Sequence, residues 1–269
     1  ALALSTKISE EIYYWALSAS CDLAAESGPH EGFAETRAAH GDLQFDLWGI
    51  EPSDLTRWAA LKDRVSQHGL RNSLMIAIAP TATIASIAGC YECIEPQVSN
   101  LFKRETLSGE FLQINRYLVN ELQDRGLWTE DMAQRIKRDE GSIQDIEEIP
   151  ADLRQIYRTA WELPQRSLID LAASRGAYVD QSQSLNLFME SPSIGKLSSM
   201  YMHAWKSGLK TTYYLRSRPA TRINQTTTGS DDIGSDGPPT DGASEPSPFT
   251  DEEAIACSLE NPESCEACD

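Results

Sequence analysis

The chain has 269 residues, 41% of them apolar and 24% charged, so it holds enough apolar material for a folded core and is not collagen-like, coiled-coil or wholly disordered. Its formal net charge of −18 disfavours nucleic acid as a partner, because an acidic protein repels phosphate backbones. The sequence has no apolar run long enough to span a membrane and no visible signal peptide, which predicts a cytoplasmic protein with no membrane partner.

Two helices and a strand are predicted in the first eighty residues. The first helix is expected to be capped by Ser5 and to end at Ser27, with a buried face made of Ile8, Ile12, Trp15, Ala19 and Leu23. The second is expected between Asp54 and Gly69, burying Leu55, Trp58, Leu61 and Val65. Residues 74–79 are apolar on both faces, which is typical of a buried parallel strand.

Helices and short strands are expected to alternate through the rest of the chain up to residue 218. Helices are predicted over 111–122, 151–175 and 193–205, closed by Gly126, Gly176 and Gly208, and strands over 177–179 and 211–215. The order helix, glycine, strand occurs three times. It predicts an α/β fold with a parallel sheet that forms part of a barrel, with functional loops at the carboxyl ends of the strands.

The last fifty residues differ from the rest in composition. Twelve acidic residues and no Lys or Arg lie between Gln225 and Asp269, in a background of Gly, Pro, Ser and Thr. So little apolar surface cannot offset the entropy of ordering the chain. We therefore expect two parts: a folded part over 1–218 and a flexible acidic tail over 219–269.

The first candidate for chemistry is the segment Pro80-Thr-Ala-Thr-Ile84, between the predicted strand 74–79 and a helix. A turn at this place offers free backbone N–H groups, the positive end of a helix dipole and two hydroxyls, all suited to phosphate oxygens. A threonine-capped helix without a ligand explains the same pattern.

Tyr213 and Tyr214 are the second candidate. Adjacent aromatic residues on a strand usually pack on opposite faces, but two adjacent phenols in a protected site could instead pass on an electron with its proton. The pair alone does not decide between these readings.

The cysteines are the third candidate. Cys90 and Cys93 form one C-x-x-C motif, and Cys265 and Cys268 form another at the end of the tail. A zinc site from both pairs, a redox dithiol on the tail, and a tail whose cysteines have no role are the alternatives. The four histidines show no metal-binding spacing, and Glu92 and Glu95 could be structural or could contact a substrate.

Longer motifs, in a fixed order along nearly the whole chain, resemble the C-terminal part of the large, catalytic subunit of class I ribonucleotide reductases. They are Arg71-Asn-Ser-Leu-Met-Ile-Ala, Pro80-Thr-Ala-Thr, Ile94-Glu-Pro-Gln-Val-Ser-Asn, Leu107-Ser-Gly-Glu-Phe, Gly176-Ala-Tyr-Val-Asp-Gln-Ser-Gln-Ser-Leu-Asn, Gly208-Leu-Lys-Thr-Thr-Tyr-Tyr-Leu-Arg-Ser-Arg-Pro and Cys257-Ser-Leu-Glu-Asn with the terminal cysteine pair.

The resemblance implies a ten-stranded α/β barrel, of which residues 1–218 would form the C-terminal part. It also implies the radical-based reduction of ribonucleoside diphosphates to deoxyribonucleoside diphosphates for DNA synthesis. Thr81, Ala82, Thr83 and Ile84 match the segment that holds the substrate's phosphates. Many relatives have Ser-Thr where this chain has Thr83-Ile84, so Ile84 would contribute only its backbone amide.

The resemblance also implies roles for the tyrosines and the tail. Tyr214 would receive the radical from the small subunit, and Tyr213 would pass it to the active-site thiol. Cys265 and Cys268 match the tail dithiol that re-reduces the active-site disulfide and is itself reduced by thioredoxin or glutaredoxin. No role is carried over to the pair Cys90 and Cys93.

The implied partners are a metal-containing small subunit that supplies the radical, a second copy of the large subunit, and the N-terminal remainder of the large subunit. In the family, the thiyl-radical cysteine and the regulatory nucleotide sites lie in that remainder. We therefore expect the chain alone to be inactive and to bind no cofactor of its own. The alternative is a non-catalytic module, derived from the same subunit, that docks a partner.

Overall fold

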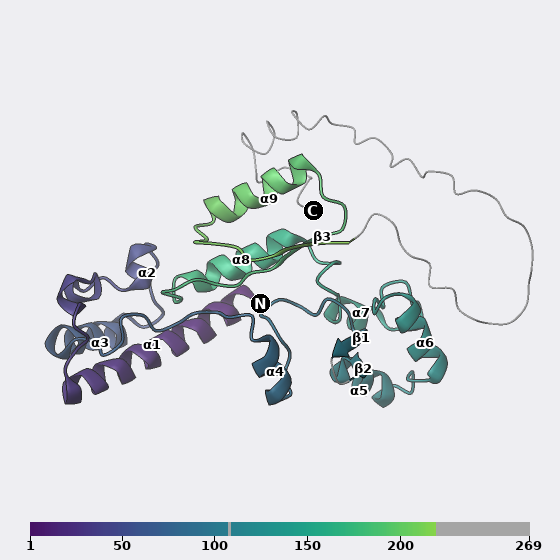
Figure 1. Ribbon diagram of the computed structural model, residues 1–269, viewed down its shortest axis with the longest axis horizontal. Helices are drawn as coiled ribbons and strands as arrows, with labels where there is room; N and C mark the ends of the chain where they lie inside the picture. Colours follow the sequence, from purple (N-terminus) through teal and green to yellow (C-terminus); the bar gives the residue numbers. More distant parts are fainter. Residues whose placement is uncertain (107–108, 219–269) are drawn as a thin grey trace, which may run out of the picture.

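The computed structural model describes residues 1–106 and 109–218 (Figure 1). The predicted tail over 219–269 therefore lies outside the described residues. The elements follow in the order α1 (Leu2–Ser27), η1 (Phe33–Glu35), η2 (Ala38–His40), α2 (Gln44–Leu47), α3 (Leu55–His68), α4 (Ala82–Ala88), β1 (Leu101–Thr106), β2 (Gly109–Ile114), α5 (Arg116–Asp124), α6 (Glu130–Arg138), α7 (Ala151–Ile156), α8 (Gln165–Gly176), β3 (Leu187–Met189), α9 (Ile194–Lys206) and β4 (Leu215–Ser217).

Three extended segments run parallel to one another and confirm the α/β expectation. β3 pairs with β4, with Leu187 opposite Leu215, and an isolated parallel bridge joins Ile78 to Gln183. Around this bridge, Ser182 and Ser184 bond to Ile78, whereas Leu185 and Leu187 bond to the segment that contains Tyr213 and Tyr214. Alternate residues of an extended segment point to opposite edges. Residues 182–189 therefore lie between the other two segments.

Three strand predictions need correction. The strand predicted over 211–215 lies further along the chain, at Leu215–Ser217. Residues 74–79 are extended as predicted, but Leu74 is exposed and Ile76 only partly buried, since the described chain leaves that face uncovered. Residues 177–179 are buried but form no strand. Tyr178 N–H instead bonds to Arg175 C=O, which continues the turn at the end of α8, and the extended segment begins after it.

The first helix packs with a different face from the one predicted. It begins at Leu2 without a side-chain cap, and it buries Tyr13, Leu17 and Cys21 against α3 and α8. The predicted face is exposed. The prediction failed because this helix carries two apolar stripes, and the period of the pattern does not show which stripe packs against a neighbour. α3 agrees with prediction: Asp54 caps it and Trp58, Leu61 and Val65 are buried, although Leu55 is exposed.

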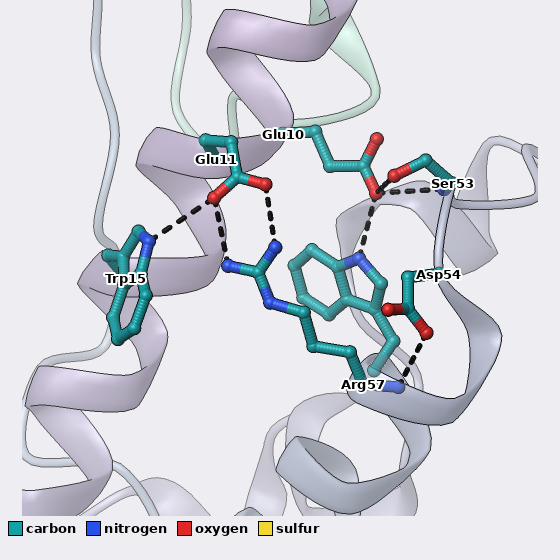
Figure 2. Close-up of polar contacts among 7 residues, drawn as sticks. Glu10, Glu11, Trp15, Ser53, Asp54 and Arg57 are labelled. Carbon is teal, nitrogen blue, oxygen red and sulfur yellow. Dashed lines mark hydrogen bonds and ion pairs between the residues drawn. The ribbon is translucent and has the colours of Figure 1, made fainter.

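Two adjacent glutamates of α1 fix its position against α3 (Figure 2). The buried Glu10 carboxylate accepts hydrogen bonds from Ser53 N–H, Ser53 Oγ and Trp58 Nε1, the last at 2.9 Å. Glu11 pairs with Arg57 through both carboxylate oxygens, and the Arg57 guanidinium lies 3.6 Å from the centre of the Tyr14 ring. The satisfied Glu10 carboxylate thus ties the start of α3 to α1.

A second core lies in the segment between residues 99 and 157, which occupies the other end of Figure 1 from α3. Its antiparallel hairpin, β1 and β2, includes Phe111 and Ile114, although their spacing predicts a helix. That helix, α5, begins only after Asn115, whose side chain caps it, and buries Leu118 and Leu122 as predicted. No pattern in the sequence predicts the hairpin or α6.

The predicted long helix over 151–175 is two helices. α7 ends at Ile156 and α8 starts at Gln165, directly after Pro164. Proline lacks the N–H that a continuous helix would need and restricts the residue before it, so the chain leaves the helix and re-enters it. α9 confirms the prediction, with Ser193 as its cap, and Gly208 follows at φ +80°.

Gly141 provides a direct test of the second core. Its φ is +86°, and a Cβ built there would lie 1.9 Å from Ser99 Oγ and 2.7 Å from the backbone N of Asn100. We expect Gly141→Ala to lower the free energy of unfolding by about 3 kcal/mol or more, since both the backbone and its neighbours must shift. Urea denaturation of the 269-residue chain measures this.

Gly126 is the matched control for that substitution. Its φ is +69°, but a Cβ there would meet nothing within 4 Å. We expect Gly126→Ala to cost only about 1 kcal/mol, from backbone strain alone. Equal losses at both positions would contradict the close packing of Gly141 against Ser99 and Asn100.

Candidate active site

The register of the parallel segments brings two of the predicted site motifs to the same level. On one edge, Ile78 lies opposite Gln183, so three residues later Thr81 lies at about the level of Asn186. On the other edge, Leu215 lies opposite Leu187, so Tyr214 lies at the level of Asn186 as well. The motifs therefore flank the middle segment from its two edges. This grouping follows the rule that functional loops gather at one end of parallel strands.

Residues 81–84 start a helix, as predicted. Thr81 precedes α4 with φ +54°, and its carbonyl accepts the N–H of Ala85. Thr83 and Ile84 are exposed in the first turn of α4. Helix N-termini leave backbone N–H groups without intrahelical partners, so this turn has donors for an anion.

Tyr213 and Tyr214 lie side by side and do not point to opposite faces, as adjacent residues of a strand would. They precede β4 rather than lying inside it, so the alternation of faces in a strand does not apply to them. Their ring centres are 4.1 Å apart, their hydroxyl oxygens are 3.4 Å apart, and about half of each side chain is exposed. The hydrogen bond to Tyr214 raises the pKa of Tyr213.

A buried polar group holds the middle segment at Asn186. The Glu95 carboxylate accepts hydrogen bonds from the Asn186 N–H at 2.6 Å and from Asn186 Nδ2 at 3.2 Å. Burial lowers the pKa of nearby Arg175 to about 10, and the Glu95 charge opposes that shift. The motif around Glu95 is compatible with a structural role or a substrate contact, and the structure shows a structural one: Glu95 positions the backbone between the two site motifs.

The structure describes only one of the two predicted cysteine pairs. Cys93 lies beside Asn186, with Nδ2 to Sγ at 3.7 Å, and Cys90 is exposed. Cys265 and Cys268 lie outside the described residues. Within the described ranges, no three His, Cys, Asp or Glu residues are grouped to hold a metal ion.

A pocket of about 390 Å³, which no motif in the sequence predicts, lies between the start of α8, the end of β3 and α9. His203 lines it, and His203 Nε2 lies 2.8 Å from Asp170 Oδ1. The contact joins α8 to α9, two helices that no local spacing in the sequence connects.

Comparison with known proteins agrees with this architecture. The family model described as "Ribonucleotide reductase, barrel domain" matches residues 1–215. The ribonucleoside-diphosphate reductase large subunits of Danio rerio and Arabidopsis thaliana are 46% and 45% identical over 98% of this chain, which spans 34% and 33% of them. The class Id ribonucleotide reductase alpha subunit of Actinobacillus ureae superposes with a TM-score of 0.60 at 26% identity, covering 81% of this chain and 34% of that one.

No helix in the part of the chain that the structure describes is long and apolar enough to span a membrane. The chain spans about a third of the length of the curated relatives that it matches. A family match over residues 1–215, together with the parallel segments and the grouping of motifs around Asn186, shows that the chain belongs to the ribonucleotide reductase barrel-domain family.

Proposed function

We propose that this chain acts as part of the large subunit of a ribonucleoside-diphosphate reductase, which makes deoxyribonucleoside diphosphates for DNA synthesis in the cytoplasm. The observation that carries the proposal is the contact between the Tyr213 and Tyr214 hydroxyls, at the level where residues 81–84 approach the same segment. Two phenols in contact are suited to radical transfer, whereas aromatic residues that only pack have no need to bring their hydroxyls together.

The relay in this proposal runs from Tyr214 to Tyr213. Oxidised Tyr214 takes one electron from Tyr213 and regains a phenolic proton, and Tyr213 loses both. Tyr213 then takes an electron and a proton from an active-site thiol, which becomes the thiyl radical. The hydroxyl oxygens of Tyr213 and Tyr214 are 3.4 Å apart, so the transfer from Tyr213 to Tyr214 is direct. At neutral pH the Tyr213 phenol is protonated, because phenols ordinarily titrate near pH 10 and the hydrogen bond to Tyr214 raises the pKa of Tyr213 further.

The substrate in this proposal is a ribonucleoside diphosphate with its phosphates at residues 81–84. Thr81 and Thr83 offer hydroxyl donors, and Ala82 and Ile84 offer only their amides. Ile84 lacks the hydroxyl that many relatives have there, so its position contributes less to phosphate binding.

The rest of the catalytic cycle involves further groups and partners. A metal-containing small subunit supplies the radical, and the chain binds no cofactor itself. Cys265 and Cys268 re-reduce the active-site disulfide and are reduced in turn by thioredoxin or glutaredoxin. The N-terminal remainder of the large subunit supplies the thiyl-radical cysteine, and the complete subunit works as a homodimer.

A docking module is the second candidate, and the exposed apolar stripe of α1 favours it. Ile8, Ile12 and Trp15 are each about half exposed or more, which suits a surface covered by another part of a larger assembly. The same stripe fits the reductase proposal, since a partial barrel exposes surface that its remainder covers. Docking and catalysis therefore need an experiment that separates them.

An exchange experiment separates them. Residues 1–218 of this chain replace the matching part of a complete large subunit, such as that of Danio rerio. Binding to the small subunit and formation of deoxyribonucleotide are then measured. We expect both binding and product. A folded exchange protein that binds the small subunit but forms no product would favour the docking module.

A further inference from the structure

The turn over residues 179–181 joins α8 to the middle segment and contacts the segments on both sides of it. Three carbonyls in a row, those of Val179, Asp180 and Gln181, accept hydrogen bonds from the Lys210 ammonium at 3.1, 2.7 and 2.8 Å. Successive carbonyls of an extended chain point to opposite edges, so three that converge on one atom mark a sharp bend. An ammonium has three N–H donors, and here each donor has one carbonyl to bond.

The same turn holds the segment that leads to residues 81–84. The Asp180 carboxylate accepts hydrogen bonds from the N–H groups of Met75 and Ile76 at 2.7 and 2.8 Å. The Gln181 N–H in turn bonds to Ile76 C=O. One turn therefore anchors both of the segments that carry the predicted site motifs.

The Lys210 ammonium fixes the chain between α9 and the tyrosine pair. Leu209 N–H bonds back to α9, and Tyr213 N–H bonds to Leu185 C=O of the middle segment at 2.7 Å. Between these two points, the ammonium ties the stretch to the turn over residues 179–181. Loss of the ammonium would release the stretch that leads into the pair.

The strand after the pair does little to fix its register. β4 is short, and of its three residues only Leu215 is partly buried. Register is specified strongly only where one face of a strand is buried. In the observed register Tyr214 lies at the level of Asn186, and a shift by one residue would put Tyr213 there instead. The pair therefore needs a constraint from outside β4, and the Lys210 ammonium provides one.

The chemistry of the contact suits an ammonium in particular. Burial lowers the pKa of Lys210, and the charge of Asp180 opposes that shift. Lysine carries a compact charge with donors in three directions, whereas the guanidinium of arginine is a flat fork. Three carbonyls around one nitrogen match the first shape. A free ammonium ion has the same charge and the same N–H donors, so it can bond to the same three oxygens.

We propose that Lys210 is a positioning residue for the tyrosine pair: its ammonium, bound by the three carbonyls of the turn, sets the level of Tyr213 and Tyr214 against the middle segment. The importance of this level for catalysis rests on the proposed function, in which the pair passes on a radical. Asp180 holds the segment that leads to residues 81–84 from the same turn. Lys210 therefore affects radical transfer, and Asp180 affects the binding of substrate.

Hydrogen exchange of the complete 269-residue chain tests the position of the pair without any turnover. In Lys210→Ala, we expect the N–H groups of Tyr213 and Leu187, which bond between the two segments, to exchange at least about tenfold faster, while those of α3 keep their rates. Ammonium chloride should restore part of the protection. Tetramethylammonium chloride at the same concentration should restore none, because this ion has the charge but no N–H donor.

Lys206→Ala is the matched control for this substitution. Lys206 is the last residue of α9 and is exposed, four positions before Lys210. The substitution removes the same side chain but leaves the ammonium at the turn in place. We expect the N–H groups of Tyr213 and Leu187 to exchange at the rates of the unsubstituted chain, with or without ammonium.

Kinetics of a complete large subunit with residues 1–218 exchanged should separate the two anchors. With the small subunit present, Lys210→Ala should lower kcat at least about tenfold and leave KM for the ribonucleoside diphosphate unchanged, and ammonium should raise kcat again. Asp180→Asn should raise KM, since an amide replaces one of the two acceptors that hold Met75 and Ile76. A general loss of stability would not produce this division, nor a recovery that depends on N–H donors.

Three results would overturn the proposal. The first is a folded Lys210→Ala chain in which Tyr213 and Leu187 exchange at unchanged rates. The second is exchange that rises as much in α3 as at Tyr213, and the third is equal recovery with both salts. Lys210→Met, which keeps the length of the side chain, replaces the alanine variant if circular dichroism shows that variant to be unfolded. An unsubstituted exchange protein that forms no product would contradict the reductase function instead, because hydrogen exchange decides the position of the pair independently.

Discussion

Tyr214→Phe should abolish nucleotide reduction by a complete large subunit that carries residues 1–218 of this chain, while its binding to the small subunit stays intact. Phenylalanine keeps the ring but has no phenolic proton to lose and no accessible one-electron oxidation. The Tyr213 hydroxyl would then lack its partner at 3.4 Å. We expect turnover to fall at least about 1,000-fold, equivalent to about 4 kcal/mol in the barrier.

Tyr117→Phe is the matched control for this substitution. Tyr117 lies on α5, apart from Tyr213 and Tyr214, and is well exposed. The substitution removes the same hydroxyl group as Tyr214→Phe but leaves the two phenols in place. Its turnover should equal that of the unsubstituted protein. If Tyr214→Phe instead weakened binding to the small subunit and left turnover per bound complex unchanged, the pair would serve docking and not radical transfer.

Trp58→Ala should cause the largest loss of stability in the core that α1 and α3 share. Trp58 is 2% exposed, lies 4.7 Å from the Phe45 ring centre and donates to the buried Glu10 carboxylate. Truncation would leave a large cavity and remove one of the hydrogen bonds of a buried charge. We expect the free energy of unfolding to fall by about 4 kcal/mol or more, measured by urea denaturation.

Two further variants separate the contributions to that loss. Trp58→Phe keeps much of the packing but removes the donor to Glu10, so we expect about 1–3 kcal/mol. Trp205→Ala removes the same side chain from α9, where it is 71% exposed, and should cost less than about 1 kcal/mol. A loss at Trp205 as large as at Trp58 would contradict the described placement of the two residues.

Local signals in the sequence predicted the helices well where capping and glycine coincide. Asp54 and Gly69 bound α3, and Ser193 caps α9, because these residues act on the backbone next to them. The break between α7 and α8 also had a local signal in Pro164, which the apolar periodicity outweighed. The hairpin β1 and β2 depends on pairing between two segments, and no strong turn motif marked it.

The buried faces and the geometry of the site depend on distant contacts, so the sequence could not supply them. α1 has two apolar stripes, and only its packing against α3 and α8 shows which one is buried. The Tyr213 and Tyr214 hydroxyls meet because the pair precedes regular strand structure. The contact of Glu95 with Asn186 spans 91 positions, and spacing alone gives no hint of it.

Formation of deoxyribonucleoside diphosphate tests the central proposal most directly, measured side by side with the small subunit for three proteins. These are the large subunit with residues 1–218 exchanged, the same protein with Tyr214→Phe, and the 269-residue chain alone. We expect product from the first and none from the other two. Product formed at the full rate with Tyr214→Phe, or none from a folded exchange protein that binds the small subunit, would contradict it.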